Sequence, residues 1–585
     1  MRTPVRRSLV LATLLALLLG VVGGSAPAAL AAKPPTSTRV AGIDVDATTI
    51  PQLQALMDSH RLNSVMLVQF YLHRIAQLNP KLHAVIRVSP TALADARRAD
   101  FARRRGDHQP LLGIPVLVKD NVDAAGMPTT AGSWALAGST PDDAFIIERL
   151  RASGAIVIAK ANLSEWANFR SGPSSSGWSG IGGQTNMPYV LDRNPCGSSS
   201  GTGSGIAADL ATVGIGTETD GSIVCPAGAN GIVGIKPTLG LWSRAGVVPI
   251  SAEQDTAGPM ARNVTDAAVL LGALTGVDPD DAATAAQPGH AVADYTQFLD
   301  SDALEGARIG VWRFGPAPTY NATTAPVVEP ILNDTIATLE AQGATVVDGT
   351  DIDLSAAANE FPALLCEFKT DIASYLDTYT AAGYPKTLAE LIAFNNAHPE
   401  LEGPWNNLVF DLAEQTAGRD ADCADLREAT TPPVQEAIDQ LMTDNDLDAI
   451  IALTNGPAWP TNSDPNLGDL DSLFATYFVG SSGAAAVSGY GTITVPAAYA
   501  SGLPVGISFI GGRWSEPELI GFAYDFEQAT HARVPPTFIA SIGDALFPGV
   551  PNPSDAAVQQ RAATPDQRRS AVPPWSGSWR MAPLR

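Results

Sequence analysis

The chain has 585 residues, of which 45% are apolar and 16% carry a charge. This apolar content excludes an intrinsically disordered protein, and four cysteines are too few for a small disulfide-stabilised scaffold. Acidic residues outnumber basic ones by 60 to 36, which gives a net charge of -24. Binding to nucleic acid or to an anionic membrane needs clustered Lys and Arg, so we expect neither partner for this protein.

The first 31 residues have the pattern of a secretory signal peptide. Three arginines precede an apolar run from Leu9 to Val22, and small residues follow as far as Ala31. This run is too short to cross about 30 Å of hydrocarbon, which needs about 20 residues. We therefore expect cleavage after Ala31 and secretion. The pair Arg6-Arg7 leaves both the general and the twin-arginine export route open.

Helices and strands are predicted in alternation along most of the chain. The spacing of apolar residues predicts two helices within 48–79, and residues 81–105 predict a short strand followed by a helix. Short apolar runs at 114–118 and 155–159 predict buried strands. The alternation predicts α/β layers over a mainly parallel sheet. Further candidates lie at 206–211, 231–235, 266–275, 307–313, 325–342, 344–347, 448–453, 492–496, 505–510 and 515–529.

The domain organisation is less clear from composition. Length alone suggests about four domains of about 150 residues each. Residues 350–480 predict mostly helix, and no period of about 20 to 50 residues recurs, which excludes a solenoid. The last fifty residues are rich in proline, and we interpret 536–585 as an irregular tail.

The four cysteines form two groups. Cys366 and Cys423 lie in the same predicted helical region and are candidates for a disulfide, which an oxidising compartment would preserve. Cys196 and Cys225 flank Ser- and Gly-rich motifs, and we interpret them as buried thiols.

The stretch 171–259 is rich in Ser and Gly and poor in charged residues. Apolar segments follow each Ser/Gly block, which argues against a flexible linker. Residues 197–201 formally match the G-x-S-x-G elbow of hydrolases, but a loop-like segment precedes them and no later histidine has a catalytic context. The sequence contains neither C-x-x-C nor H-E-x-x-H, so we expect no metal site.

Three motifs, in this order, resemble those of the amidase signature family. The resemblance spans about residues 45–535, which we interpret as one catalytic domain. It implies a single large α/β domain with a central twisted mixed, mainly parallel sheet covered by helices on both faces. The motifs are Gly113-Ile-Pro-Val-Leu-Val-Lys-Asp120, Cys196-Gly-Ser-Ser-Ser-Gly201 and Gly216-Thr-Glu-Thr-Asp-Gly-Ser-Ile223, with further matches at 234–238, 255–259 and 503–507.

Some positions depart from the usual family motifs. They are Cys196, Ser200 and the pair Thr219-Asp220. These variants resemble the bacterial peptide amidases, which hydrolyse C-terminal peptide amides.

The resemblance implies a Ser-Ser-Lys catalytic set made of Lys119, Ser198 and Ser222. In this family the residue matching Ser222 forms the acyl-enzyme, and the residue matching Ser198, which follows a cis peptide bond, passes protons between it and the lysine. The lysine acts as a base only when it is neutral, which requires a pKa lowered by burial. The apolar run 114–118 favours burial of Lys119, whereas the neighbouring Asp120 opposes it and must either point away or pair with another group.

The resemblance also implies groups that bind the substrate. The backbone N–H groups of Thr219, Asp220, Gly221 and Ser222 are expected to form an oxyanion hole. The carbonyl near Gly172 is expected to face the substrate.

Two further expectations concern side chains near these motifs. The carboxylates of Glu218 and Asp220 are expected to accept hydrogen bonds from loop N–H groups rather than to act as acids. Trp166, Phe169 and Trp178 are equally compatible with a pocket wall and with the core.

The sequence therefore predicts a secreted amidase that converts a small-molecule or peptide carboxamide to a carboxylic acid and ammonia, without metal or cofactor. Peptide amides, small aliphatic amides and aryl-acylamides all remain open as substrates. Export argues against a glutamyl-tRNA amidotransferase subunit, because charged tRNA is cytoplasmic. A catalytically inactive secreted binding protein on the same scaffold would lack one of Lys119, Ser198 and Ser222, and all three are present. The sequence leaves the oligomeric state open.

Overall fold

The structure is a computed structural model that describes residues 37–313, 325–464, 466–469 and 479–542. The chain divides into two units, Met1–Ser37 and Thr38–Arg585, and the fold described below belongs to the second unit. The predicted signal peptide and the part of the predicted tail beyond residue 542 lie outside the described residues.

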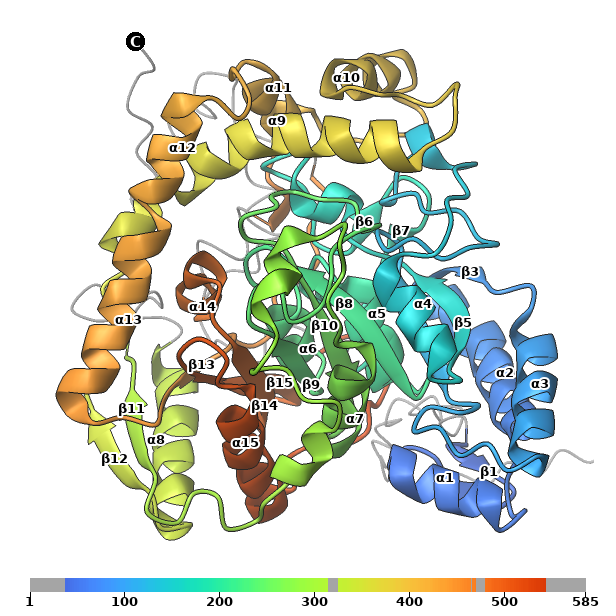
Figure 1. The fold of residues 1–585 in the computed structure, drawn as a ribbon, viewed down its shortest axis with the longest axis vertical. Helices are drawn as coiled ribbons and strands as arrows, with labels where there is room; N and C mark the ends of the chain where they lie inside the picture. The colour runs from blue at the N-terminus through green and yellow to red at the C-terminus, as the bar shows by residue number, and fades with distance from the viewer. Residues whose placement is uncertain (1–36, 314–324, 465, 470–478, 543–585) are drawn as a thin grey trace, which may run out of the picture. The chain divides into compact units, whose positions relative to one another are not determined.

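An eleven-stranded sheet forms the centre of this unit, in the order β12-β11-β13-β15-β14-β9-β10-β8-β4-β5-β3 (Figure 1). Two small sheets, β1-β2 and β6-β7, lie outside it. The strands are β1 Arg39–Val40, β2 Ile43–Asp44, β3 Val85–Val88, β4 Pro115–Lys119, β5 Ile156–Ala161, β6 Trp178–Ser179, β7 Gly183–Gln184, β8 Val213–Glu218, β9 Val233–Lys236, β10 Thr256–Ala261, β11 Arg308–Val311, β12 Thr345–Asp348, β13 Ala449–Leu453, β14 Thr492–Ala500 and β15 Leu503–Ile510.

The central sheet is mixed, as predicted, and the fold is α/β. The prediction of mainly parallel pairing is wrong. Of the ten strand pairs in this sheet of the described residues, four are parallel and six are antiparallel. A continuous run of antiparallel pairs extends from β8 through β10, β9, β14 and β15 to β13. These strands are buried along nearly their whole length, and such strands read as apolar runs whichever way they pair.

Two groups of helices contact the sheet. Helices α4, α7, α15 and α8 contact one another in this order and pack on strands, whereas α5 and α6 contact each other and the strands around β8 and β9. The helices are α1 Ile50–Asp58, α2 Ser64–Leu82, α3 Ala92–Arg104, α4 Phe145–Ala152, α5 Ser200–Ala207, α6 Val224–Ala229, α7 Val264–Leu274, α8 Ala325–Ala341, α9 Glu360–Tyr379, α10 Leu388–Ala397, α11 Leu408–Glu414, α12 Ala421–Glu428, α13 Thr431–Asn445, α14 Ser482–Ser488 and α15 Glu516–Thr530.

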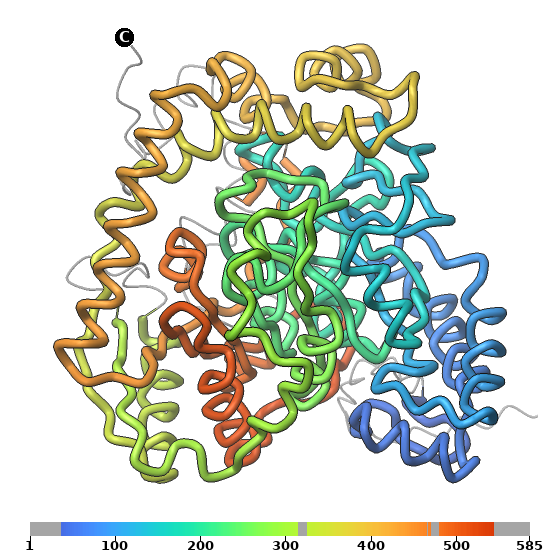
Figure 2. Tube along the Cα trace, in the orientation of Figure 1, coloured from blue at the N-terminus to red at the C-terminus, as the bar shows by residue number. Residues whose placement is uncertain are grey.

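Segments far apart in the sequence meet in the sheet. Strand β14 pairs with β9, so the orange-red part of the trace lies beside the green part (Figure 2). The main hydrophobic core surrounds the sheet. A second apolar cluster joins α9, α10 and α11, which belong to the region predicted to be mostly helical, to residues at 131–136, 166–169 and 248–250.

The beginning of the predicted tail packs against the domain. The N–H groups of Phe538 and Ile539 donate to the carbonyls of Pro188 and Tyr189, and the N–H of Leu191 donates to Ile539. Residues 536–542 therefore follow the chain near Tyr189.

Among the described residues, none of the helices combines the length and the apolar character that crossing a bilayer requires.

Candidate active site

Sheet topology brings the first and third motifs together. Strands β4 and β8 are parallel neighbours, with Val118 opposite Ile215. The carboxyl ends of parallel strands meet at the same edge of a sheet, where ligands bind in many α/β proteins. Lys119 ends β4 and Glu218 ends β8, so the two motifs meet at this edge.

Lys119 is fully buried, and the acceptors around its ammonium group are neutral. Its Nζ donates to Ser198 Oγ at 2.8 Å, to Thr217 Oγ1 at 2.8 Å and to the Thr217 carbonyl at 3.2 Å. Burial lowers the pKa of Lys119 to about 7, although the negative charges of Asp255 and Glu218 act in the opposite direction. A substantial fraction of Lys119 is therefore neutral near pH 7, as a general base must be.

The structure resolves the problem posed by Asp120. Its carboxylate lies 3.2 Å from the ammonium of Lys160, which is itself fully buried at the end of β5. The hydroxyl of Thr130 also donates to Asp120. Lys160 donates further to the carbonyl of Val122 at 2.7 Å. The negative charge beside Lys119 thus has its own cation, and burial of Asp120 raises its pKa.

The segment around Ser198 is tightly enclosed. The peptide bond between Gly197 and Ser198 is cis, and Ser198 is fully buried. The Ser164 N–H donates to the Ser198 carbonyl at 3.0 Å. A Cβ atom at position 197 would overlap Ser164 Oγ and approach Ser176 Cβ to 3.2 Å, so only glycine fits there.

Ser222 lies on the turn between β8 and α6. Its carbonyl accepts a hydrogen bond of 3.1 Å from the N–H of Ser199, the residue after Ser198. Ser222 is 8% exposed, whereas Lys119 and Ser198 are 0% exposed. The structure therefore joins Lys119 to Ser198 by a direct hydrogen bond and places Ser222 beside the segment of Ser198. Of these three residues, Ser222 is the one that solvent reaches.

The turn of residues 219–222 is held from both sides. Glu218 Oε2 accepts from the N–H groups of Ile223 and Val224 at 2.7 and 2.9 Å, which confirms the expected role of that carboxylate. Thr219 Oγ1 donates to Asp255 at 2.5 Å. Asp220 differs from Glu218: its side chain is exposed, and it lies next to the Ser482 hydroxyl.

The backbone of this turn offers free donors. Within the described part of the chain, none of the N–H groups of residues 219–222 donates to another protein group. The positive φ of 78° at Gly221 lets the chain reverse directly before Ser222. Unpaired N–H groups in a turn next to an accessible hydroxyl are suited to stabilising an oxyanion.

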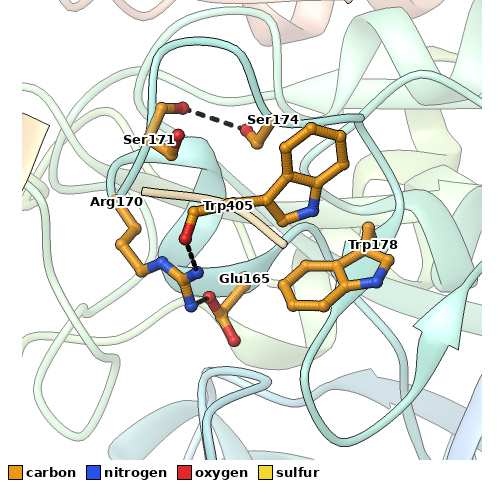
Figure 3. A pocket seen from close by; sticks show the side chains of 6 residues that line it. All are labelled: Glu165, Arg170, Ser171, Ser174, Trp178 and Trp405. Carbon is orange, nitrogen blue, oxygen red and sulfur yellow. Dashed lines mark hydrogen bonds and ion pairs between the residues drawn. The ribbon is translucent and has the colours of Figure 1, made fainter. Parts of the chain in front are cut away.

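Gly172 lies on a different loop, in an exposed position. Its neighbour Ser171 lines a small pocket together with Glu165, Arg170, Ser174, Trp178 and Trp405 (Figure 3). Arg170 pairs with Glu165 and donates to the Trp405 carbonyl at 2.8 Å. No hydrogen bond within the described residues joins Gly172 to Lys119 or Ser198.

The three aromatic candidates divide between core and pocket. Trp166 and Phe169 belong to the second apolar cluster and pack edge-to-face on Phe410 and Phe368. Trp178 is half-buried and lines the pocket of Figure 3.

All four cysteines form disulfides. Cys366 bonds to Cys423, in agreement with their selection as a candidate pair. Cys196 bonds to Cys225, so the interpretation of these two residues as buried thiols is wrong. The two cysteines are 29 positions apart, and the sequence did not indicate that they lie close together. Their proximity depends on the packing of α5 against α6.

Two polar residues near Lys119 were missed from the sequence. Thr217 Oγ1 interacts with Lys119 and also accepts from Asn121 Nδ2 at 3.0 Å. Their positions in the sequence could have identified them, because Asn121 directly follows the first motif and Thr217 lies inside the third. Among the described residues, no group of three or more His, Cys, Asp or Glu side chains is arranged to hold a metal ion.

Comparison with known proteins identifies the family. The model of the Amidase family matches residues 66–520. A probable amidase of Arabidopsis thaliana is 41% identical over 508 residues, which cover 85% of this chain and 92% of the relative. The solved peptide amidase of Stenotrophomonas maltophilia is 45% identical, with a TM-score of 0.77, and the match covers 84% of this chain and 99% of that one.

A further structure shows a peptide amidase in complex with the competitive inhibitor chymostatin. It is 46% identical, with a TM-score of 0.77, over 84% of this chain and 99% of that one. The family model extends over the segments that contain Lys119, Ser198 and Ser222. The chain belongs to the amidase signature family and is an amidohydrolase.

Proposed function

We propose that this amidase hydrolyses the C-terminal carboxamide of peptides through Ser222, Ser198 and Lys119, and that it does so outside the cytoplasm. The observation that carries the catalytic assignment is the 2.8 Å hydrogen bond between the buried Lys119 ammonium and the Ser198 hydroxyl. A lysine with a pKa of about 7 at this place can hold or release a proton near neutral pH.

In the proposed reaction, Ser222 Oγ attacks the carboxamide carbon. Its proton passes to Ser198 Oγ while the Ser198 proton passes to neutral Lys119, because a serine hydroxyl needs a base to become nucleophilic. The developing oxyanion accepts hydrogen bonds from the free N–H groups of residues 219–222, and one such donor typically contributes about 2.7–4 kcal/mol to transition-state stabilisation.

Collapse of the tetrahedral intermediate breaks the C–N bond. The proton held by Lys119 returns through Ser198 to the nitrogen, so that ammonia leaves rather than an amide anion. Water then enters, gives a proton to the same pair and attacks the ester to Ser222. Release of the carboxylic acid returns the proton to Ser222 Oγ.

Similarity supports a peptide substrate. The chain is 45% identical over nearly the whole length of the peptide amidase of Stenotrophomonas maltophilia. A structure of a peptide amidase with the competitive inhibitor chymostatin has the same fold. Small aliphatic amides and aryl-acylamides are the alternative substrates, and an inactive secreted binding protein is the alternative of another class.

Export is supported by composition and by covalent structure. The first 31 residues have the charged and apolar pattern of a signal peptide. Both disulfides of the described domain are of the kind that persists in oxidising compartments. Sequencing the N-terminus of protein collected from culture medium tests this: a mature chain starting after Ala31 is expected, and full-length protein confined to the cytoplasm contradicts it.

The nucleophile is tested by labelling. The intact enzyme is treated with a serine-directed sulfonyl fluoride, and the adduct is mapped by peptide mass spectrometry. We expect the label on Ser222 and its loss in Ser222→Ala, together with most of the amidase activity. Ser59→Ala, an exposed serine at the end of α1, is the matched control and retains both. A label elsewhere, or an active Ser222→Ala, refutes the assignment.

The substrate class is tested by ammonia release from a peptide amide and a short aliphatic amide, and by aniline release from an anilide. The highest kcat/KM is expected for the peptide amide. If it is the poorest of the three, the peptide-amide proposal is wrong while the amidase assignment stands. No turnover and no labelling of Ser222 would favour the inactive binding protein.

A further inference from the structure

The disulfide Cys196–Cys225 joins the two segments that carry the serines of the proposed mechanism. Cys196 lies two residues before Ser198, and Cys225 lies three residues after Ser222, in the first turn of α6. We propose that this disulfide is a positioning element, which holds Ser198 and Ser222 in a fixed relation to each other. This inference rests on the catalytic roles proposed above.

Each half of the disulfide is tied directly to its serine segment. On one side, the Cys196 N–H donates to Asn194 Oδ1 at 2.9 Å, and the Cys196 carbonyl accepts from Ser200 Oγ at 2.6 Å. On the other side, the Cys225 N–H donates to the carbonyl of Gly221, the residue before Ser222, at 2.8 Å. A displacement of either cysteine therefore moves the neighbouring serine.

Hydrogen bonds also join these two segments. Ser199 donates its N–H to the Ser222 carbonyl at 3.1 Å, and Asn230 Nδ2 donates to the Pro195 carbonyl at 2.8 Å. Ser199 Oγ also donates to the Thr217 carbonyl at 3.1 Å and accepts from the Thr217 N–H at 3.2 Å. None of these bonds involves the side chain of Ser198 or Ser222. Along the chain, the disulfide lies between the Ser199–Ser222 bond and the Asn230–Pro195 bond, and it is the link that thermal motion does not break.

The backbone conformation of Cys196 indicates that its side chain has a specific role. Its φ of 59° lies in the left-handed region, which favours glycine and is uncommon for other residues. Glycine is also the residue that the family motif usually has at this position. A cysteine in this conformation gives up the freedom of glycine and gains the bond to Cys225. Such a loss of backbone freedom in return for a covalent bond is expected where the next two residues, Gly197 and Ser198, must be held in a fixed position.

The second disulfide provides a matched control. Cys366 and Cys423 join α9 to α12, outside the three motifs, and enclose a sequence separation of 57 residues against 29 for the first pair. A longer closed loop contributes at least as much stability when the unfolded chain is constrained. If turnover falls when Cys196–Cys225 is removed but not when Cys366–Cys423 is removed, a loss of stability alone therefore does not explain the fall.

The experiment compares Cys196→Ala/Cys225→Ala with Cys366→Ala/Cys423→Ala in the full mature enzyme, on the amide that the wild type turns over best. For the first variant we expect kcat at least about tenfold below wild type with KM within about threefold, because a displacement of about 1 Å can cost about 100-fold in rate. Labelling of Ser222 by a sulfonyl fluoride is expected to slow in parallel. The control is expected to keep wild-type kcat. A kcat within twofold of wild type in the first variant refutes the proposal.

A second measurement covers the case in which the first variant does not fold. In folded Cys366→Ala/Cys423→Ala enzyme, Cys196–Cys225 is the remaining disulfide, and graded reduction can be followed by titrating free thiols. Activity is expected to fall as two thiols appear and to return on reoxidation. Complete reduction without a change in kcat refutes the positioning role. A wild-type enzyme without turnover or Ser222 labelling would instead refute the proposed function.

Discussion

Asp120 forms its ion pair with Lys160 and not with Lys119, its immediate neighbour in the sequence. Lys119 is the last residue of β4 and Asp120 is the first residue of the turn that follows, and their side chains enter different surroundings. Lys119 meets the hydroxyls of Ser198 and Thr217, whereas Asp120 meets the buried ammonium of Lys160, 3.2 Å away. The separation removes a counterion that would keep Lys119 protonated.

The first prediction concerns pH. Because burial lowers the pKa of Lys119 to about 7, its proton is lost as the pH rises through 7, and the neutral amine is the active form. We expect kcat/KM to increase with pH, with an apparent pKa near 7, and to level off above it. The measurement is ammonia release between pH 5 and 9, with unfolding followed at the same pH values. An activity that is already maximal at pH 5 in folded enzyme contradicts a basic role for Lys119.

The second prediction concerns the Asp120–Lys160 pair. Lys160→Met leaves a buried carboxylate without its cation, and breaking such a pair typically costs about 3–5 kcal/mol of unfolding free energy. Asp120→Asn/Lys160→Met removes both charges and is expected to be less destabilised than Lys160→Met. Urea denaturation of both variants and the wild type measures the difference. Equal stability of the two variants would mean that leaving Asp120 without its cation carries no penalty.

Several parts of the site were predictable because they depend on local sequence. The apolar run 114–118 predicted a buried strand directly before Lys119, and the observed strand β4 spans Pro115–Lys119. The contacts of Lys119 with Thr217 and of Asp120 with Lys160 were not predictable, because they depend on which strands are neighbours in the sheet. Strand order follows from packing of the whole chain, and apolar runs specify burial without specifying partners. The same limit explains the unexpected antiparallel pairs.

The third prediction concerns the carboxylate that holds the turn before Ser222. Glu218 Oε2 accepts from two backbone N–H groups, of Ile223 and Val224. Glu218→Ala leaves these buried donors unpaired, at a cost of about 1–3 kcal/mol, and lets the turn shift, so kcat is expected to fall by about tenfold or more. Glu218→Gln keeps an acceptor oxygen and is expected to retain most of the activity. Steady-state kinetics and thermal unfolding of the two variants measure this. If Glu218→Gln is as inactive as Glu218→Ala, the negative charge matters rather than the acceptor.

The fourth prediction concerns the space beside Ser198. A methyl group at position 197 would overlap Ser164 Oγ and crowd the Ser200 hydroxyl at 3.0 Å, so Gly197→Ala must displace the segment that carries Ser198. We expect an activity loss of about 100-fold, since misplacement by about 1 Å is enough to cause it. Gly512→Ala is the matched control, because nothing lies within 4 Å of the methyl group it would add. Both variants are assayed for ammonia release and for retention of fold by circular dichroism. A Gly197→Ala enzyme with the activity of Gly512→Ala would show that the site tolerates movement of Ser198.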